Sequence, residues 1–391
     1  MFGNKMDIIT AMLLLLGVGL VLGQLFEHFR VVAIAGEIIG GILLGPAVFN
    51  IVTPDAILYS ISEISLFFIM LLLGIEMTVD LLRKPYRRAL PLTMTSFVIP
   101  AIMMFLLLYF AVRYSLAASV IVSISIGVPS ISIISVLVRN YGLLQKDAGL
   151  TMLSSVVLSD LIAFLLLSAF LGTRQLIPEV FIFLIFIIVI YYLDKFITSH
   201  SEAIIKAFGR LHATEHGEKI IFGAIIFGGL LVSTIFQSIG ITFVLGAFFS
   251  GMLISEVVVG KDLLGILTRT LNRMNESFFI PVYFTIAGLS MLIPGASYVA
   301  TLLALLLLTG VVAAYMNFRM SRKLSIDISP RSTVGFLGAR GAVGVVIAGT
   351  ALSYSLINHE MYSVILFGTV AMASFFPVLI SEGKNKPETS T

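Results

Sequence analysis

The sequence predicts an all-α protein that crosses a membrane many times. Of its 391 residues, 59% are hydrophobic and only 12% are charged, and the mean hydropathy is +1.09. These values lie far outside the range of soluble globular domains. Apolar runs of about 20 residues fit transmembrane helices, whereas a barrel would show alternating segments of about ten. Helices also satisfy the backbone polar groups for which lipid offers no partners.

Thirteen apolar runs are long enough, or nearly so, to serve as spans. They cover residues 8–26, 31–52, 57–75, 89–112, 116–138, 150–171, 176–193, 220–238, 240–258, 278–293, 298–317, 332–356 and 362–380. The first run is too long for a signal-peptide core and is expected to be retained. Placing the loops alternately on two sides puts 20 of the 24 lysines and arginines on one side and 3 on the other. The positive-inside rule therefore predicts that the N-terminus lies outside and the C-terminus lies in the cytoplasm. The membrane is expected to be the plasma membrane.

The spans divide into two halves with matching irregularities. Spans one to six (8–171) and eight to thirteen (220–380) are joined by a predicted linking helix at 176–193. This offset of seven spans makes the halves run in opposite directions, as inverted repeats. The fifth span of each half is interrupted, at Gly127–Ser130 and around Gly338–Gly344. Discontinuous helices at corresponding places indicate the midplane binding site of a transporter.

One acid and one base stand alone inside predicted spans. Asp160 lies in the middle of 150–171, and Arg340 is the only lysine or arginine that cannot be assigned to a loop or a helix end. The helical neighbours of Asp160 at three and four positions are all apolar: Val156, Val157, Ala163 and Phe164. Burial there disfavours the charged form, so a proton is expected to compete with a monovalent cation for the carboxylate.

The predicted cation site combines hard oxygen ligands around Asp160. The hydroxyls of Ser159 and Ser130 are candidates, together with carbonyls freed at Val128 and Pro129, where the proline removes a backbone donor. The sequence has no cysteine and no mid-span histidine for a transition metal. The predicted metal is therefore Na⁺ at Asp160 as transported ion, with no structural metal and no cofactor.

Three further charged residues have predicted supporting roles. Arg340 either binds the carbonyls at the facing helix C-termini or clamps a carboxylate such as Glu76. Glu76 itself is expected in a solvated funnel at the cytoplasmic end of its span. Glu37 lies in a glycine-rich stretch where helices pack closely, with a role in the ion pathway as the functional alternative.

The polar segments suggest little beyond transport. Leucines with interleaved arginines from Leu263 to Met274 predict a short amphipathic helix on the cytoplasmic surface. His212 and His216, four apart in a loop, are read as ordinary polar surface. The tail after Ile380 is too short for a regulatory C-terminal domain. The net charge of +3 reflects topology, so no nucleic-acid partner is expected.

Five stretches resemble signatures of the sodium/proton antiporters of the NapA and Kef type, in the monovalent cation:proton antiporter superfamily. They are AGEIIGGILLGP (Ala35–Pro46), LLLGIE (Leu71–Glu76), SDLIAF (Ser159–Phe164), GAFFSGMLISE (Gly246–Glu256) and ARGAVGVVIAG (Ala339–Gly349). They occur in the family's order over nearly the whole chain. The resemblance maps the family's essential carboxylate onto Asp160, its unwound-helix ligands onto Pro129 and Ser130, and its arginine onto Arg340.

The resemblance also implies an architecture. It is a NapA/NhaA-like fold of thirteen helices in a homodimer, with two crossed discontinuous helices. A core, ion-binding domain, at about 57–171 and 278–380, would move against a dimerisation domain, at about 8–52 and 176–258, in an elevator motion.

Two departures from the family pattern bear on stoichiometry. Electrogenic members carry a second acid directly before the essential aspartate, and here that position is Ser159. They also place a lysine in the helix corresponding to Leu302–Asn317, which has no basic residue here. One titrating carboxylate predicts electroneutral exchange of one cation for one proton.

The predicted function is secondary exchange of Na⁺ (or Li⁺) for H⁺, and not an enzymatic reaction. A K⁺/H⁺ antiporter of Kef type is the alternative, because hydroxyl ligands discriminate poorly between these ions. An ion channel or sensor on the same fold is a further alternative. An intramembrane protease is disfavoured, because it would need a second mid-span aspartate or a serine with a histidine base.

Overall fold

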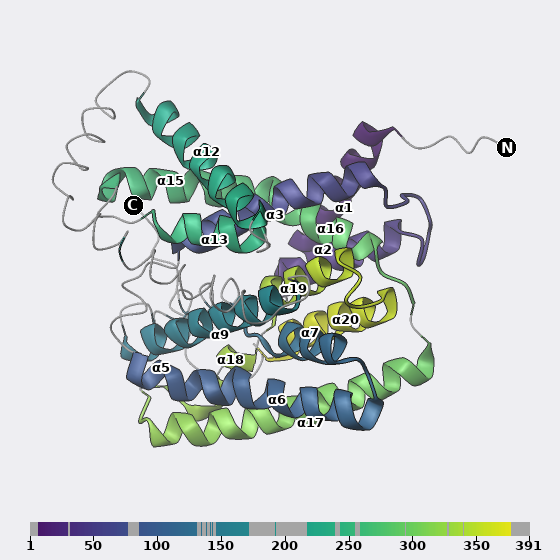
Figure 1. Ribbon diagram of the computed structural model, residues 1–391, viewed down its shortest axis with the longest axis vertical. Coiled ribbons are helices and arrows are strands. Elements are labelled where there is room, and N and C mark those ends of the chain that lie inside the picture. The colour runs from purple at the N-terminus through teal and green to yellow at the C-terminus, as the bar shows by residue number, and fades with distance from the viewer. Residues whose placement is uncertain are drawn as a thin grey trace. The chain divides into compact units, whose positions relative to one another are not determined.

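The computed structural model of the protein is helical (Figure 1), and the residues that it describes contain no β-strand. Those residues are 7–29, 32–76, 86–130, 134, 138, 141, 143, 146–171, 192, 217–238, 243–254, 259–293, 295–326, 328–338 and 340–376. The predicted all-α class is thereby confirmed. The predicted linking helix at 176–193 falls outside the described residues except for Tyr192, as do His212 and His216.

The described helices follow the predicted spans along the chain. Three short stretches, labelled η, are π-helices in which the backbone hydrogen bonds span five residues rather than four. In chain order the helices are α1 (Ile8–His28), α2 (Ala33–Leu44), α3 (Ala56–Glu76), α5 (Tyr86–Thr93), η1 (Met94–Val98), α6 (Ile99–Leu106), η2 (Leu107–Val112), α7 (Leu116–Gly127), α9 (Asp147–Leu171), α12 (Gly217–Ser238), α13 (Phe243–Met252), α15 (Lys261–Met274), η3 (Asn275–Phe279), α16 (Ile280–Leu289), α17 (Ala296–Lys323), α18 (Pro330–Gly338), α19 (Ala342–Ser353) and α20 (His359–Phe375).

Seven stretches of the described helices are long and apolar enough to cross a bilayer. They are Ile8–His28, Ala56–Glu76, Arg87–Val112, Asp147–Phe164, Lys219–Ser238, Leu303–Lys323 and Pro330–Ser353. Two shorter apolar helices, α2 and α7, accompany them. The protein is therefore a multi-pass membrane protein, and the count of thirteen spans stays a prediction.

Two elements differ from their predicted spans for local reasons. The helix predicted over 31–52 ends at Leu44, because Gly45 precedes Pro46 and takes an extended conformation. The connector predicted over Leu263–Met274 is α15, and it continues through η3 into α16 without a loop. The predicted amphipathic helix is confirmed, whereas its separation from the next span is not observed.

Contacts divide the chain into two compact units, each described here by itself. Unit 1 comprises Met1–Leu58, Asp80–Leu167 and Phe284–Thr391, and unit 2 comprises Tyr59–Val79 and Ser168–Tyr283. These units do not follow the predicted core and dimerisation domains, since α1 and α2 fall in the same unit as α7 and α19. The two functional domains stay a prediction.

Unit 1 is built by close helix packing. The helix α6 runs alongside both α7 and α17, and α19 packs against α7 and α20 (Figure 1). Glycine permits backbone contact between α1 and α2, because a Cβ at Gly36 would overlap the carbonyl of Leu22.

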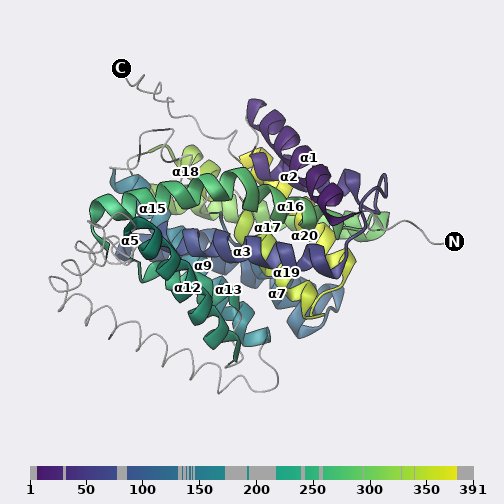
Figure 2. The same ribbon diagram turned by 90° about the horizontal axis from the view of Figure 1, so that it is seen from above.

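Unit 2 packs α12 against α13 (Figure 2). One face of α15 is buried there, where Leu263 and Leu267 contact Ile221 and Val259. The Nδ2 group of Asn275 in η3 donates to the carbonyl of Phe68 in α3, at 3.2 Å. The apolar contacts bury one face of α15 within unit 2.

Candidate functional site

The first helix interruption lies at the end of α7. The helix begins where Ser115 caps it, its side chain accepting from the N–H of Ala118 at 3.2 Å. It ends at Gly127, and Val128 takes an extended conformation with ψ of 124°. Pro129 explains this geometry, because a proline disfavours helical angles at the residue before it. Val128, Pro129 and Ser130 are all buried.

The second interruption separates α18 from α19. The helix α18 ends at Gly338 and α19 begins at Ala342, with Arg340 in the irregular segment between them. Gly344, which the sequence grouped with the break, lies inside α19. A Cβ at Gly344 would overlap the carbonyl oxygen of Ser125 in α7. The segments around the two interruptions therefore meet, and glycine makes their backbone contact possible.

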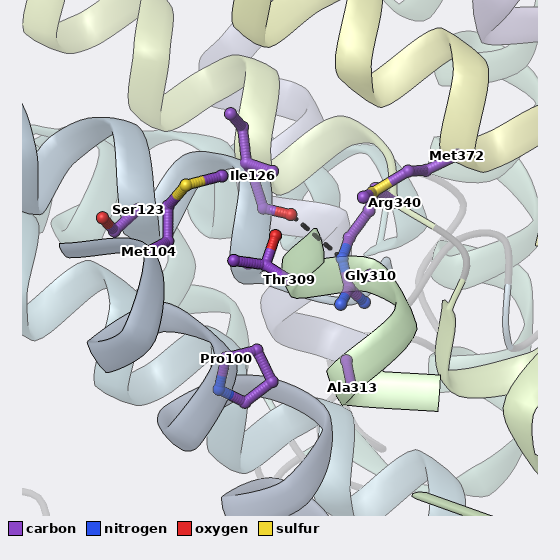
Figure 3. A pocket seen from close by; sticks show the side chains of 10 residues that line it. Pro100, Met104, Ser123, Ile126, Thr309, Gly310, Ala313, Arg340 and Met372 are labelled. Atoms are coloured by element: carbon purple, nitrogen blue, oxygen red, sulfur yellow. Dashed lines mark hydrogen bonds between the residues drawn. The ribbon is translucent and has the colours of Figure 1, made fainter. Parts of the chain in front are cut away.

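Arg340 binds three carbonyls from three different helices. Its Nε donates to Ile126 at 3.0 Å (Figure 3), its Nη1 to Leu337 at 2.7 Å and its Nη2 to Ser96 at 3.2 Å. Ile126 lies in the last turn of α7, and Leu337 in the last turn of α18. Carbonyls at a helix C-terminus lack helical donors and carry partial negative charge, which the guanidinium offsets.

The third acceptor of Arg340 is the carbonyl of Ser96, which lies four residues before a proline. In a regular helix the N–H of residue 100 would donate to the carbonyl of residue 96, but Pro100 has no N–H. Ser96 lies in the π-helix η1, and Pro100 lies in the first turn of α6. Arg340 supplies a donor to the Ser96 carbonyl from outside the helix. Of the two predicted roles for Arg340, the described hydrogen bonds correspond to carbonyl binding, and its function in the site stays a prediction.

Asp160 is fully buried in α9 and its carboxylate has no hydrogen-bond partner among the described residues. Its exposed fraction is 0%, and neither Oδ1 nor Oδ2 accepts a hydrogen bond there. The adjacent hydroxyl of Ser159 donates instead to the carbonyl of Ser155, at 2.9 Å. A buried carboxylate with two unpartnered oxygens is costly, and a proton or a bound cation would remove that cost.

A hydrogen bond links the helix of Asp160 to the span that contains Ser96. The hydroxyl of Thr93, at the end of α5, donates to the carbonyl of Ser155 at 3.0 Å. Ser155 is five residues before Asp160, or about 7.5 Å of helical rise. Ser96 is three residues after Thr93, and its own Oγ is also buried without a described partner. The span α5–η1–α6 thus contacts both α9 and Arg340.

A small cavity lies beside Arg340 in unit 1 (Figure 3). Its volume is about 20 Å³, and α6, α7, α17 and α20 contribute lining residues. Its polar lining includes Ser123, Thr309 and Arg340. Such a space is large enough for about one water molecule. The cavity adjoins the interruption of α7, because Gly127 also lines it.

Two predicted supporting acids, Glu76 and Glu37, lie in α3 and α2. Glu76 is half-buried at the end of α3, in unit 2. Glu37 is 3% exposed in α2, and a Cβ at Gly23 of α1 would lie 3.4 Å from its Cγ. No described hydrogen bond joins Glu37 to Asp160 or Arg340. Glu37 lies where α2 packs against α1, in the glycine-rich stretch for which close helix packing is predicted.

Sequence reasoning missed two contributors to this site, Ser96 and Pro100. A mid-span proline was the available signal, since it frees the carbonyl four residues before it. Within the described residues, no group of three or more histidine, cysteine, aspartate or glutamate side chains lies together.

Comparisons with known proteins give consistent results. Residues 11–381 match the family described as "Sodium/hydrogen exchanger, transmembrane". The probable Na(+)/H(+) antiporter 3 of Methanocaldococcus jannaschii is 26% identical over 375 residues, which cover 94% of each chain. The Na(+)/H(+)-K(+) antiporter GerN of Bacillus cereus is 22% identical, with 92% of this chain and 91% of GerN aligned.

A solved structure also shares the architecture. The sodium proton antiporter MjNhaP1 from Methanocaldococcus jannaschii is 16% identical, and the match covers 96% of each chain. The TM-score of 0.66 shows a common fold.

Proposed function

This chain belongs to the sodium/hydrogen exchanger family, and we propose that it exchanges Na⁺ (or Li⁺) for H⁺ at the carboxylate of Asp160. It is a transporter and not an enzyme, and the predicted resemblance to the cation:proton antiporters is confirmed. The observation that carries the assignment of the site is the burial of Asp160 with both carboxylate oxygens unpartnered. A single buried acid of this kind can be neutralised by either of the two exchanged ions.

Coupling follows from competition at one carboxylate. A proton on Asp160 removes the negative charge that holds Na⁺, and Na⁺ in contact with the carboxylate disfavours protonation. The two ions therefore occupy the site in turn. If the empty, charged carboxylate is too costly to carry across the membrane, each crossing moves one ion or the other. This alternation converts a gradient of one ion into a gradient of the other.

The remaining ligands of the proposed site come from the interruption of α7 and from α9. Carbonyls of Val128 and Pro129 and the hydroxyl of Ser130 would complete an oxygen shell for Na⁺. The hydroxyl of Ser159 donates a hydrogen bond to the carbonyl of Ser155, which leaves the lone pairs of its oxygen free to coordinate a cation. Together with the carboxylate of Asp160, these four hard oxygens suit a monovalent alkali cation.

Arg340 has a positioning role in this proposal. Its three hydrogen bonds tie together the C-terminal ends of α7 and α18 and the carbonyl of Ser96. Because the guanidinium serves carbonyls, it does not neutralise Asp160, whose carboxylate has no described partner. The charge of Asp160 thus stays available for the transported ion.

Alternating access requires a rearrangement of the structure. Asp160 is fully buried in the observed conformation, so the site must open to each side of the membrane in turn. We propose an elevator-type motion of a core domain that carries two crossed discontinuous helices, within a thirteen-helix NapA/NhaA-like fold of inverted repeats. The meeting of Gly344 with Ser125 supports a rigid contact between the two interrupted segments.

We further propose that exchange is electroneutral, with one Na⁺ per proton. Ser159 stands where a second acid would precede Asp160, and Leu302–Asn317 contains no basic residue. With one titrating carboxylate, the site carries either one Na⁺ or one H⁺ and the same charge moves in both directions.

K⁺/H⁺ exchange is the second candidate for the transported ion. The name of GerN includes both Na⁺ and K⁺, and hydroxyl and carbonyl ligands are compatible with either ion. Ion preference is therefore decided by transport assays with each cation in turn.

The proposed topology places the C-terminus in the cytoplasm and the N-terminus outside, in the plasma membrane, with two copies forming a homodimer. Within unit 1, Arg88 and Asp147 form an ion pair at 3.7 Å, and both residues lie in loops predicted on the cytoplasmic side. At the opposite predicted side, Nδ1 of His359 lies 3.0 Å from the carbonyl oxygen of Ser290. The first pair joins two loops that the predicted alternation places on the cytoplasmic side. In the second pair, His359 lies in a loop predicted outside and Ser290 lies near the outer end of the predicted span 278–293.

The proposal is tested in proteoliposomes that contain a pH-sensitive dye. Na⁺, Li⁺ and K⁺ are added in turn to vesicles with the wild-type protein and with the Asp160→Asn variant. Cation-driven proton movement by the wild type, absent from the variant, is the expected result. Equal activity of the correctly folded variant would rule out Asp160 as the exchange site.

A further inference from the structure

The outer face of α17 carries three basic side chains around an apolar groove. A cavity of about 720 Å³ is lined there by residues that include Tyr315, Met316, Arg319, Arg322 and Lys323. Tyr315 is 62% exposed, and the guanidinium carbon of Arg319 lies 6.0 Å from the centre of its ring. The opposite face of α17 is buried at Ala313, Asn317 and Ser321. The groove thus lies along the exposed edge of α17, where Thr95 of η1 also lines it.

Within the described residues the basic cluster has no ion-pair partner. Arg319, Arg322 and Lys323 are exposed and form no ion pair within the described part of the chain. The nearby ion pair of Arg88 and Asp147 uses a different arginine. Three cations clustered at one rim attract an anion, and the arginines present the planar donors that suit a phosphate.

The position of the groove along α17 corresponds to the boundary of the bilayer. The helix has 28 residues, about 42 Å of rise, whereas the hydrocarbon core is about 30 Å thick. Arg319, Arg322 and Lys323 occupy its last two turns, where a span leaves the hydrocarbon. Tyr315 and Met316 lie about one turn earlier in α17, at the depth where acyl chains would begin. A ligand of the groove would therefore meet cations at the surface and an apolar wall below them.

We propose that this α17 groove binds one anionic phospholipid. The phosphate would lie between Arg319, Arg322 and Lys323, and an acyl chain would lie against Tyr315 and Met316. An amphiphile fits both parts of the groove, whereas a soluble anion would use only the basic rim. This assignment is independent of the transport mechanism, because none of these residues belongs to the ion site.

The chain allows a local measurement because it contains no tryptophan. The Tyr315→Trp substitution keeps an aromatic ring in the groove and introduces the single tryptophan of the chain, which is excited selectively at wavelengths that tyrosine does not absorb. The full-length variant is reconstituted into phosphatidylcholine vesicles with equal mole fractions of brominated phosphatidylglycerol or brominated phosphatidylcholine. Bromine quenches only a nearby indole, so quenching reports the lipid that occupies the groove.

The expected result is quenching by brominated phosphatidylglycerol at least about twofold stronger than by brominated phosphatidylcholine, since each basic residue near the surface attracts anionic lipid. The preference should disappear when Arg319, Arg322 and Lys323 are replaced by glutamine. It should persist in a matched control with glutamine at Arg269 and Arg273 of α15. Raising choline chloride should weaken it in the parent variant, because salt screens exposed charges.

Equal quenching by the two lipids in the parent variant would overturn the proposal. So would a preference that survives the three glutamine substitutions. If glycerophosphate protects the groove from a charged quencher while the two lipids quench equally, the groove binds a soluble anion, and the lipid assignment is wrong. The salt series needs no further substitution, so the proposal stays testable even if the triple variant fails to fold.

Discussion

Arg340 donates a hydrogen bond to the carbonyl of Ser96 at 3.2 Å, the acceptor for which Pro100 cannot provide a helical N–H. A buried cation on one helix thus satisfies a carbonyl that a proline exposes on another. The same guanidinium holds the last turns of α7 and α18 through Ile126 and Leu337. The geometry of the proposed ion site therefore depends on a residue that does not contact the ion.

The Pro100→Ala substitution tests this dependence. It returns an N–H to position 100, so the Ser96 carbonyl no longer needs Arg340. We expect Arg340→Ala to lower the free energy of unfolding of the otherwise wild-type protein by several kcal/mol. Three buried carbonyls then lose their hydrogen-bond donor, at a cost of about 1–3 kcal/mol each. In the Pro100→Ala variant, Arg340→Ala should lower the free energy of unfolding by about 1 kcal/mol less than it does in the wild type. Thermal unfolding of the two single variants and the double variant in detergent measures this coupling.

Pro91→Ala is the matched control, because it removes a proline from the same span at a position whose freed carbonyl is not an acceptor of Arg340. The Pro91→Ala and Arg340→Ala effects should add. Additivity in the Pro100 cycle as well would show that Arg340 and the proline act independently.

Gly344→Ala should disrupt the contact between α19 and α7. The new Cβ would overlap the carbonyl oxygen of Ser125, and neither backbone can move without displacing an interrupted helix. We expect a lower unfolding temperature and loss of most exchange activity. Gly310→Ala in α17 is the control, because its Cβ would lie at an ordinary 3.6 Å from Met372. Full activity of both variants in vesicles would show that the contact has no role in transport.

Ser130→Cys should be accessible from both sides of the membrane in turn. The chain has no cysteine, so a single thiol reports one position without background. Ser130 is 1% exposed in the observed conformation, and alternating access requires it to open to each side. We expect impermeant maleimides to label it from either side of oriented vesicles. Tyr354→Cys and Arg322→Cys serve as controls that react from one side each. Labelling of Ser130→Cys from a single side would argue against alternating access at this site.

Exchange should proceed independently of membrane potential. Asp160 is the single acid of its span, and Ser159 precedes it, so one proton replaces one cation. In proteoliposomes, clamping the potential with valinomycin and K⁺ should leave the rate of Na⁺-driven proton movement unchanged within error. An increase or decrease of the rate with potential would show that net charge crosses in each cycle.

The sequence predicts those parts of the site that depend on local chemistry. Pro129 disfavours helix at the residue before it, and α7 ends at Gly127. Asp160 is isolated among apolar neighbours, and the structure buries it completely. The amphipathic pattern from Leu263 to Met274 likewise predicts the helix that the structure contains.

Contacts between distant residues were beyond sequence reasoning. Arg340 and Ser96 are 244 positions apart in the sequence. The residues around either one do not indicate that the two form a hydrogen bond. The π-helix η1 is equally hidden, because its register depends on packing as well as on Pro100. The sequence Gly45–Pro46 indicates that α2 ends near Leu44. The predicted span continued to residue 52 because the residues beyond the proline are also apolar.

The most direct test of the account measures protons released when Na⁺ binds. Purified protein in weakly buffered detergent solution with a pH dye, at a pH where Asp160 is protonated, receives NaCl, with choline chloride as the salt control. The account predicts release of about one proton per protomer by the wild type and none by the Asp160→Asn variant, because binding of Na⁺ to the carboxylate displaces its proton. Undiminished proton release by the Asp160→Asn variant would contradict the proposal that Na⁺ and H⁺ share the carboxylate of Asp160. Binding of Na⁺ by the wild type without proton release would contradict it as well.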